Sequence, residues 1–506
     1  MVYIMDTTLR DGEQTSGVSF SDLEKLNIAK ILLEELKIDF IEVASARVSD
    51  GEFKGARKVL DWANHAGYLE RVEILGFVDG KTSLEWIDRA GGKVMNLLVK
   101  GSLRHVTQQL KKSPEEHLGS IKTSLQLAEA MGIRVNIYLE DWSNGMRNSP
   151  EYVDFMLEGL RTEKVGRIML PDTLGILNPT ETFEYCSSMI RKFPDLRFDF
   201  HAHNDYDLAV ANVDAAIRAG INTIHTTVNG LGERAGNAPL SSVIALLNDQ
   251  LKVPNSVNER KLSLASRIVE NFSGIRISGN KPIIGENVFT QCSGIHADGD
   301  NKDQLYYNDL LPERFGRIRK YALGKTSGKA NIAKNLEDIG IRLDPEDLIR
   351  VTEKVIELAD KKESVTSDDL PYILSDVLKS EAVNEKIKLR NYAISHALGL
   401  RPMATVAIDV DGELFEEASS GDGQYDAFMN ALRRIYHKQN KQFPALVDYV
   451  VTIPPGGKTD ALVETLITWK MGREFKTRGL DPDQTAAAIK ATMKMLNIVE
   501  NDNQMF

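Results

Sequence analysis

The sequence predicts an α/β protein whose N-terminal half is a TIM barrel, and three observations support this fold class. Between Val2 and about Leu251, eight short apolar, strand-like runs alternate with longer helical patterns. Eight such units in about 250 residues match a (β/α)8 barrel, whose buried parallel strands are uniformly apolar. Polar residues collect where the runs end, on the face where barrel enzymes carry their chemistry. The competing open, doubly wound sheet would place a glycine-rich phosphate turn after its first strand, and the DTTLRDG stretch from Asp6 is not one.

The expected elements follow directly from these runs. The expected strands are Val2–Met5, Phe40–Ala44, Val72–Val78, Val94–Val99, Val135–Leu139, Arg167–Leu170, Phe198–Phe200 and Thr223–Val228. Amphipathic stretches lie between them, each opened by a residue typical of a helix start, and include Ser21–Leu36, Pro114–Met131, Pro150–Glu163, Pro179–Lys192 and Asp207–Ala219.

The composition changes twice along the chain, which predicts three regions. Residues 1–270 form the expected catalytic barrel, and residues 271–387 form a linker with mostly helical subdomains and a polar loop near 291–306. Residues 388–506 contain an internal repeat, in which Ala404–Glu417 matches Ala461–Glu474 at an offset of about 60 residues. Two ββα-type units of this kind predict a pseudo-symmetric regulatory domain.

The bulk composition excludes several classes of protein. A formal net charge of −11 over 506 residues makes nucleic acids poor partners. No apolar run approaches the ~20 residues of a membrane-spanning helix, and the first expected strand begins too early for a signal peptide. Two cysteines, Cys186 and Cys292, cannot build a disulfide framework or a thiolate zinc cluster. We therefore expect a cytoplasmic protein that binds neither nucleic acid nor membranes.

Side chains that could bind a metal follow three of the expected strands. His201 and His203 are two residues apart on a strand, so both imidazoles face the same way. With Asp11 after the first strand and a carbonyl oxygen from Asn237 after the eighth, they form a mixed set of nitrogen and oxygen ligands. Such a set suits Mn²⁺, Mg²⁺ or Zn²⁺ with positions left open. Alternatively, Asp11 could only pair with Arg10, and the two histidines could be a polar strand end.

Five motifs identify a resemblance to a known family. DTTLRDGEQ, YLED, PDTLG, HAHND and GLGERAGN occur in this order on the expected strands. As a set they resemble the metal-dependent barrel family of 2-isopropylmalate, homocitrate and citramalate synthases, and the citramalate branch is most similar. GIHADG and the C-terminal repeat extend the resemblance over essentially the whole chain. Related lyases carry a catalytic cysteine in the loop after strand eight, and GLGERAGNAP has none.

The resemblance implies a Claisen-type condensation of acetyl-CoA with a 2-oxo acid, followed by hydrolysis of the thioester. The oxo acid is expected to chelate the metal, which polarises its carbonyl group. Arg10 is expected to hold the keto oxygen as it becomes an alkoxide, and Thr173 to bind the carboxylate. Glu140 is the expected base that takes a methyl proton from acetyl-CoA. Taken alone, Glu140 could instead be a strand-end carboxylate paired with Arg147.

A second group of expected site residues lies outside the barrel. The resemblance implies that His296 carries protons or activates water, and that Asp298 and Tyr306 lie beside it. Gln304 stands where the citramalate branch has Asn, which puts that contact in doubt. His296 could come from the partner subunit of a dimer, or it could be an ordinary loop residue.

The expected oxo-acid pocket is small and apolar. Tyr138 and Glu140 face the same way on the fifth strand, where other family branches carry a small serine two places before the glutamate. The phenol ring then fills space that an isopropyl group would need. Leu75 and Leu98 match apolar wall positions of the citramalate branch. This pattern favours pyruvate and (R)-citramalate, although Tyr138 could be ordinary barrel packing.

The resemblance also implies feedback inhibition through the C-terminal repeat by isoleucine or leucine. The residues that resemble an amino-acid pocket are Tyr425, Asp426, Leu446, Tyr449, Ile453, Val463, Pro482 and Gln484, and several would be plausible core residues in any fold. The favoured function is a citramalate synthase of isoleucine biosynthesis, a homodimer. The alternatives are a 2-isopropylmalate synthase of leucine biosynthesis, which uses 2-oxoisovalerate, and an amino-acid sensor with an inactive barrel.

Overall fold

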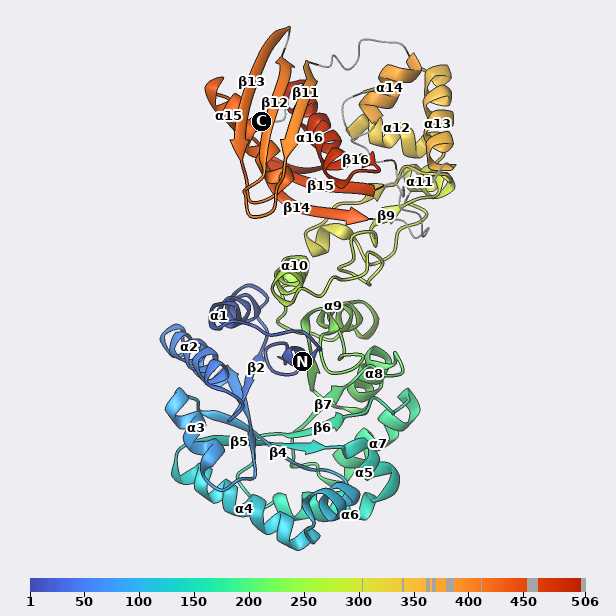
Figure 1. The fold of residues 1–506 in the computed structure, drawn as a ribbon. Coiled ribbons are helices and arrows are strands. Elements are labelled where there is room, and N and C mark those ends of the chain that lie inside the picture. Colours follow the sequence, from blue (N-terminus) through green and yellow to red (C-terminus); the bar gives the residue numbers. More distant parts are fainter. Residues whose placement is uncertain are drawn as a thin grey trace. The chain divides into compact units, whose positions relative to one another are not determined.

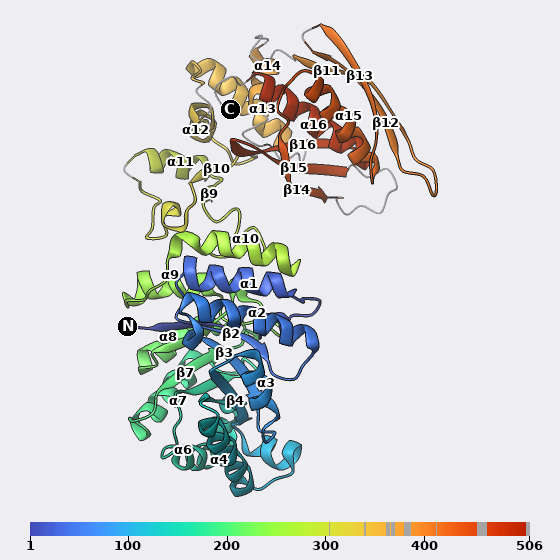
Figure 2. The ribbon, with the colours of Figure 1, turned by 90° about the vertical axis from the view of Figure 1, so that its left-hand side faces the viewer.

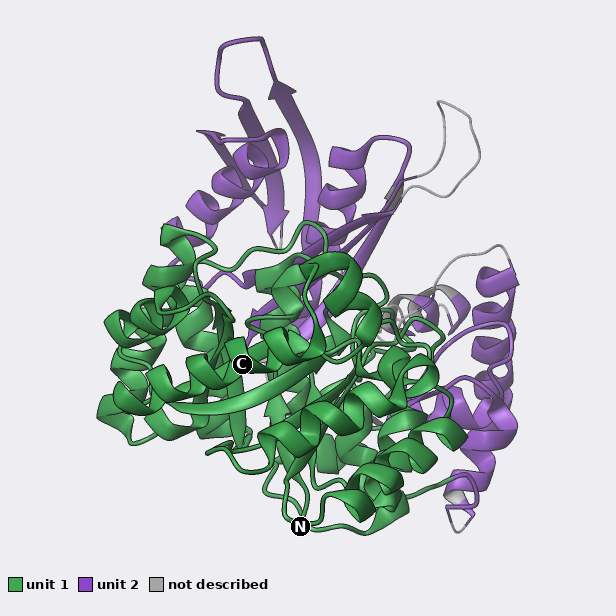
Figure 3. Ribbon diagram, turned by 90° about the horizontal axis from the view of Figure 1, so that it is seen from below, with its two compact units in different colours: residues 1–289, 307–319 green, residues 290–306, 320–506 purple. Residues whose placement is uncertain are grey.

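The fold is described from a computed structural model of the 506-residue chain. It describes residues 1–302, 304–338, 341–360, 365, 370–378, 386–410, 412–452 and 463–501. The chain divides into two compact units (Figure 3), one formed by residues 1–289 with 307–319 and the other by residues 290–306 with 320–506. No helix in the described ranges is both long enough and apolar enough to cross a membrane.

The first unit contains a closed barrel of eight strands, each hydrogen-bonded in parallel to its neighbours (Figure 1). The strands are β1 (Tyr3–Asp6), β2 (Phe40–Ser45), β3 (Val72–Phe77), β4 (Val94–Lys100), β5 (Arg134–Glu140), β6 (Ile168–Asp172), β7 (Phe198–Ala202) and β8 (Thr223–Thr226). The predicted fold class is confirmed, and most strand ends differ from the expected ones by one or two residues.

Helices surround this barrel, and α10 lies beside α1 (Figures 1 and 2). They are α1 (Asp22–Lys30), α2 (Asp50–Ala66), α3 (Thr82–Ala90), α4 (Pro114–Ala130), α5 (Trp142–Asn148), α6 (Pro150–Leu160), α7 (Pro179–Lys192), α8 (Ala209–Ala219), α9 (Leu240–Ala245) and α10 (Leu262–Ser273). Their starts follow the sequence closely. Helix α4, for example, begins with proline after Ser113, whose side chain accepts the N–H of Glu116 in a capping box.

The barrel interior is filled by layers of different character. Because alternate residues of a strand point inward, side chains two residues apart on one strand belong to successive layers. A polar layer is joined by hydrogen bonds among Glu73, Asn96, Asn136, Arg167 and Asp199. Two residues further along four of these strands come Leu75, Leu98, Tyr138 and Met169, which form an apolar cluster together with Met5 and Phe40.

The second unit contains short strands and helices followed by two antiparallel sheets. The first part comprises β9 (Thr290–Gln291), α11 (Gly294–Asn301), β10 (Lys320–Tyr321), α12 (Lys329–Asp338), α13 (Pro345–Asp360) and α14 (Leu370–Leu378). The repeat comprises β11 (Ile387–Ser395), β12 (Met403–Val410), β13 (Glu413–Ser420) and α15 (Gln424–Lys438), then β14 (Ala445–Thr452), β15 (Val463–Met471), β16 (Arg473–Asp481) and α16 (Gln484–Asn501). Each repeat forms a three-stranded sheet, one strand more than the ββα pattern predicts.

Candidate metal centre and active site

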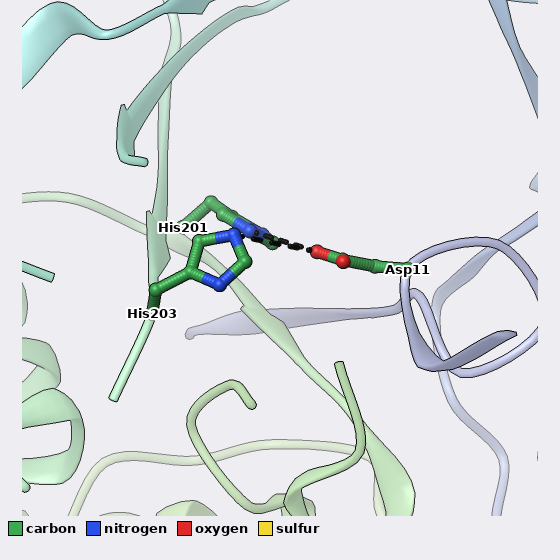
Figure 4. A group of neighbouring side chains, drawn as sticks. All are labelled: Asp11, His201 and His203. Carbon is green, nitrogen blue, oxygen red and sulfur yellow. Dashed lines mark ion pairs between the residues drawn. The ribbon is translucent and has the colours of Figure 1, made fainter. Parts of the chain in front are cut away.

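Asp11, His201 and His203 lie together at the mouth of the barrel (Figure 4). One ligand atom from each residue lies within 4.8 Å of the others. The Nε2 atoms of His201 and His203 are 3.1 Å and 3.7 Å from Oδ2 of Asp11, and all three side chains are buried. The sequence-based expectation that these residues meet is therefore met in the fold.

A tight turn brings Asp11 to this position. After β1, the carbonyl oxygen of Thr7 accepts the backbone N–H groups of Arg10, Asp11 and Gly12 at 2.8–3.1 Å. This turn directs the Asp11 side chain back over the end of the barrel. His201 lies within β7, whereas His203 comes just after it and is held by a β-bridge to Asn237.

Asn237 presents an oxygen with no hydrogen-bond donor in the described part of the chain. Its Nδ2 donates to the carbonyl oxygen of Leu231 at 3.1 Å, while Oδ1 is buried and unpartnered. Gly232 makes this close packing possible, because a Cβ atom there would lie 2.1 Å from Nδ2 of Asn237. A buried amide oxygen without a donor is costly unless a cation or a water molecule satisfies it.

The electrostatics of this group suit a cation. Burial opposes the charged form of Asp11, but the Arg10 guanidinium and the His201 imidazole outweigh burial and hold the pKa of Asp11 far below its usual value. Burial lowers the pKa of His203 to about 4 and also lowers the pKa of His201. At neutral pH the centre therefore offers one carboxylate and two neutral imidazoles, the protonation states that metal binding requires.

Arg10 lies between two carboxylates beside this centre. Its Nε donates to Glu42 of β2, and its Nη1 is 3.6 Å from Oδ2 of Asp11. Burial opposes the charge of Arg10, but Glu42 and Asp11 outweigh burial and raise the pKa of Arg10 above its usual value. The expected alternative of a lone Arg10–Asp11 pair is thus incomplete, because Glu42 is the nearer partner.

Arg10 also borders a hollow at the surface of the first unit. This hollow of about 430 Å³ is lined also by Glu13, Ser45, Ser49 and Glu52. These residues come from the loop after β1, the end of β2 and the start of α2. Arg10 therefore forms part of the wall of a hollow that a small molecule could enter.

Glu140 ends β5 and forms an ion pair with Lys100, which ends β4. The suggested pairing of Glu140 with Arg147 is wrong, because Arg147 forms a bidentate pair with Glu181 at 2.6–2.8 Å. Parallel pairing of β4 with β5 brings Lys100 directly opposite Glu140. The register of the strands therefore decides the partner of the expected base.

The chain turns sharply at Asp141, directly after Glu140. Asp141 forms hydrogen bonds with residues that follow β4, β5 and β6. Its φ angle of 64° lies in the left-handed region, which Asp tolerates better than most residues. The carboxylate accepts the hydroxyl of Ser102 and the amide of Asn144, both at 2.8 Å. Its backbone N–H donates to Oγ1 of Thr173 at 2.8 Å, so the Thr173 hydroxyl can still donate to a ligand.

The expected apolar pocket residues lie in a single cluster. Leu75, Leu98 and Tyr138 pack with Met5, Phe40 and Met169 inside the barrel. The Tyr138 ring centroid is 5.6 Å from that of His201 and 5.7 Å from the Arg10 guanidinium carbon. Tyr138 therefore lies next to both the candidate metal centre and Arg10.

In the second unit, the structure brings His296 and Tyr306 together. Their ring centroids are 4.2 Å apart, and Nδ1 of His296 is 3.3 Å from Oε1 of Gln291. Asp298, on the same helix α11, forms an exposed ion pair with Lys302 at 2.7 Å.

The expected regulatory residues are spread over both halves of the C-terminal repeat. The rings of Tyr425 and Tyr449 stack at 5.5 Å, and the Tyr425 hydroxyl lies 2.7 Å from that of Thr492. Oδ2 of Asp426 accepts the N–H of Asp422 at 2.9 Å. The remaining described residues of this set are Val463, which is buried, and Leu446, Pro482 and Gln484, which are exposed. Ile453 lies outside the described residues.

The sequence reasoning missed Glu42, Lys100 and Asp141. A usable signal existed for Glu42, because a lone glutamate interrupts the apolar strand FIEVAS. Lys100 and Asp141 carried a weaker signal, since charged residues commonly end strands. Their partners depend on strand register, which the sequence alone does not reveal.

Comparison with known proteins identifies the family. A family model described as HMGL-like matches residues 1–269. The chain is 34% identical over 507 residues to the (R)-citramalate synthase CimA of Methanocaldococcus jannaschii, covering 99% of this chain and 100% of that protein. It is 32% identical over 503 residues to the 2-isopropylmalate synthase of the same organism, covering 98% and 94%. The chain belongs to this family of synthases.

The rest of the chain matches two further models. One, described as homocitrate synthase post-HMGL domain-like, covers residues 283–363, and the other, described as LeuA allosteric (dimerisation) domain, covers residues 364–500. The protein is an acyltransferase of this synthase family, whose reaction joins acetyl-CoA to a 2-oxo acid. The two synthases are almost equally similar to this chain, so overall identity does not distinguish between their substrates.

Proposed function

We propose that this enzyme condenses acetyl-CoA with pyruvate and hydrolyses the thioester to give (R)-citramalate and CoA, in isoleucine biosynthesis. The observation that carries the choice of pyruvate is the packing of Tyr138 with Leu75 and Leu98 beside Arg10 and His201. We infer that this cluster would accept a methyl group and oppose an isopropyl group. Two further methyl groups would cost roughly 1–3 kcal/mol each through lost fit or overpacking.

Asp11, His201, His203 and Asn237 would hold the divalent cation, which when bound polarises the carbonyl group of the oxo acid. The unpartnered Oδ1 of Asn237 and the neutral imidazoles support this assignment.

The chain's own side chains would orient the substrates and move the protons. Arg10 stabilises negative charge on the keto oxygen, and the free O–H of Thr173 donates to the oxo-acid carboxylate. Glu140 takes a proton from the methyl group of acetyl-CoA, and the resulting carbanion attacks the keto carbon. Lys100 forms an ion pair with Glu140 and fixes the position of that carboxylate.

His296 would assist the hydrolysis of the thioester by activating water. Its contact with Gln291 favours a proton on Nδ1, which leaves Nε2 as the basic atom. The Tyr306 ring lies against the imidazole, and Asp298, two residues further along α11, is exposed. We propose these three residues as the second part of the active site.

We also propose that the C-terminal repeat makes the enzyme a homodimer inhibited by isoleucine. The match to a model described as LeuA allosteric (dimerisation) domain supports this proposal. Leucine would be the inhibitor of a 2-isopropylmalate synthase.

A two-substrate assay tests the proposal. Release of free CoA from acetyl-CoA is measured with pyruvate and with 2-oxoisovalerate, in the presence of Mn²⁺, Mg²⁺ or Zn²⁺. We expect kcat/KM to be at least roughly 10-fold higher for pyruvate, from the cost of the larger side chain. A preference for 2-oxoisovalerate would instead assign 2-isopropylmalate synthase activity. Background rates with both substrates would favour an amino-acid sensor.

A further inference from the structure

We propose that Glu42 is a positioning residue that holds Arg10 away from Asp11 and so leaves the Asp11 carboxylate available to the cation. This inference rests on the proposed metal-dependent function, and it assigns a role to a side chain that does not itself touch the cation or the substrate.

Arg10 has two carboxylate partners in the described part of the chain, and they compete for it. The Nε of Arg10 donates to Oε2 of Glu42, while Nη1 is 3.6 Å from Oδ2 of Asp11. Oδ2 of Asp11 is also the atom that His201 and His203 face. A full Arg10–Asp11 pair would therefore occupy the same carboxylate oxygen that the metal centre needs.

Glu42 is anchored from the opposite side. Its side chain is fully buried, and Oε1 accepts the Nδ2 of Asn96 at 2.7 Å. The Oδ1 of Asn96 in turn accepts the Nδ2 of Asn136 at 2.9 Å. The side-chain amides of Asn96 and Asn136 lie inside the barrel, where an unpaired polar group is costly. These hydrogen bonds therefore leave the Glu42 side chain little freedom to move.

The same network continues beneath the histidines. Asn136 also donates to Glu73 at 3.3 Å, and Glu73 pairs with Arg167 at 2.8 Å. Arg167 pairs with Asp199 at 2.8 Å, and Asp199 contacts Nε2 of His225 at 3.2 Å. The hydrogen-bonded network thus places Glu42 and Glu73 in comparable buried sites, but only Glu42 of these two carboxylates contacts Arg10.

Removal of the Glu42 charge should turn Arg10 toward Asp11. Buried charges are stable only when paired, and Asp11 would be the remaining carboxylate within reach of the guanidinium. The cation would then have to displace Arg10 before binding Asp11. Loss of residues that orient metal ligands typically lowers metal affinity roughly 10–100-fold.

The test is isothermal titration calorimetry, in which the full-length protein is titrated with Mn²⁺ in the absence of substrates. We expect Glu42→Gln to lower Mn²⁺ affinity by about 10-fold or more. The matched control is Glu73→Gln, which neutralises a second buried carboxylate of the same network, and it should keep Mn²⁺ affinity within about threefold. Thermal unfolding of both variants measures separately how much each substitution lowers the stability of the fold.

A double variant shows whether Glu42 acts through Arg10. In an Arg10→Met background, Glu42→Gln should change Mn²⁺ affinity by less than about threefold, because no guanidinium remains to occupy Asp11. An equal loss of affinity with and without Arg10 would overturn the proposal, as would unchanged affinity in the single variant. If Glu42→Gln does not fold, Arg10→Met/Glu42→Leu removes both charges, and near-wild-type Mn²⁺ affinity is then required.

The same titration separates this inference from the proposed function. A wild-type protein that binds no divalent cation would contradict the metal-dependent function itself. Wild-type binding that Glu42→Gln leaves intact would contradict the role of Glu42 and leave the proposed function standing.

Discussion

At the scale of single residues, Tyr138 lies where it can limit the size of the substrate. Its ring is 4% exposed and belongs to the same cluster as Leu75 and Leu98. The cluster borders His201 and Arg10, the side chains nearest to the proposed oxo-acid carbonyl. We therefore propose that the phenol ring of Tyr138 restricts the pocket to a methyl group and excludes an isopropyl group.

We predict that Tyr138→Ser shifts selectivity toward larger oxo acids. The ratio of kcat/KM for 2-oxoisovalerate over pyruvate should rise roughly 10-fold or more, because each relieved methyl contact is worth about 1–3 kcal/mol. Steady-state CoA release with both substrates measures this ratio. Tyr138→Phe keeps the ring and should keep the wild-type ratio, and an unchanged ratio in Tyr138→Ser would refute the pocket argument.

A second residue-scale prediction concerns acid stability. Nε2 of buried His117 accepts the backbone N–H of Lys100 at 3.2 Å, and burial lowers the pKa of His117 to about 4. An unfolded histidine titrates near 6.5, so between these values the unfolded chain binds a proton that the folded chain does not. The free energy of unfolding should therefore fall as pH drops from about 6.5 toward 4, by up to about 3 kcal/mol from this group.

Urea denaturation at pH 7 and at pH 4.5 checks this prediction. His117→Gln keeps an acceptor for the Lys100 N–H but cannot titrate, so its stability should fall less over the same interval. Parallel pH dependence in the two proteins would show that His117 is not responsible.

At the scale of secondary-structure elements, helix α1 joins the loops that carry the proposed chemistry. The side chain of Lys25 is buried and forms ion pairs with Glu13 at 2.7 Å and with Glu52 at 2.6 Å. Its Nζ also donates to the carbonyl oxygens of Leu9 and Val43 at 3.3 Å. One ammonium group thus ties the loop after β1 to the end of β2 and to α2.

We predict that Lys25→Met lowers the free energy of unfolding by about 3–5 kcal/mol, because it leaves two largely buried carboxylates without their cation. The matched control is Lys58→Met, which removes the exposed pair of Lys58 with Asp22 between the same two helices. That change should cost no more than about 1 kcal/mol. Chemical denaturation of both variants measures the difference, and equal costs would contradict the role of Lys25.

At the scale of the whole molecule, the C-terminal repeat is the proposed sensor of the end product. Its two halves contact each other at the starts of α15 and α16, where Thr485 donates to Gln424 at 3.2 Å. Asp426 shapes the start of α15 by accepting the N–H of Asp422 and the Nδ2 of Asn430. A charged group at this position could bind the ammonium group of an amino acid.

We predict that Asp426→Ala raises the isoleucine concentration needed for half-inhibition at least roughly 10-fold, since a charged hydrogen bond contributes about 1.5–3 kcal/mol. The uninhibited rate should remain close to wild type, because Asp426 lies outside the barrel unit. Inhibitor titrations in the CoA-release assay measure both quantities. Asn430→Ala removes a neighbour of Asp426 but keeps the carboxylate, so it should retain inhibition.

The sequence by itself determined the barrel and the residues of its candidate metal centre. Eight apolar runs require burial on both faces, and parallel strands place Asp11, His201 and His203 at one end whatever their exact bounds. Local chemistry was enough for these predictions, because each depends on where a strand ends and which way alternate side chains face.

Only the tertiary structure decided which side chains pair inside the barrel. Glu140 pairs with Lys100 rather than Arg147, and Arg10 is held by Glu42, 32 residues away in sequence. Such pairs depend on the register and stagger of neighbouring strands, and a shift of one residue would point every side chain to the other face. The sequence shows which residues are charged, but the register of the strands in the closed barrel determines which of them pair.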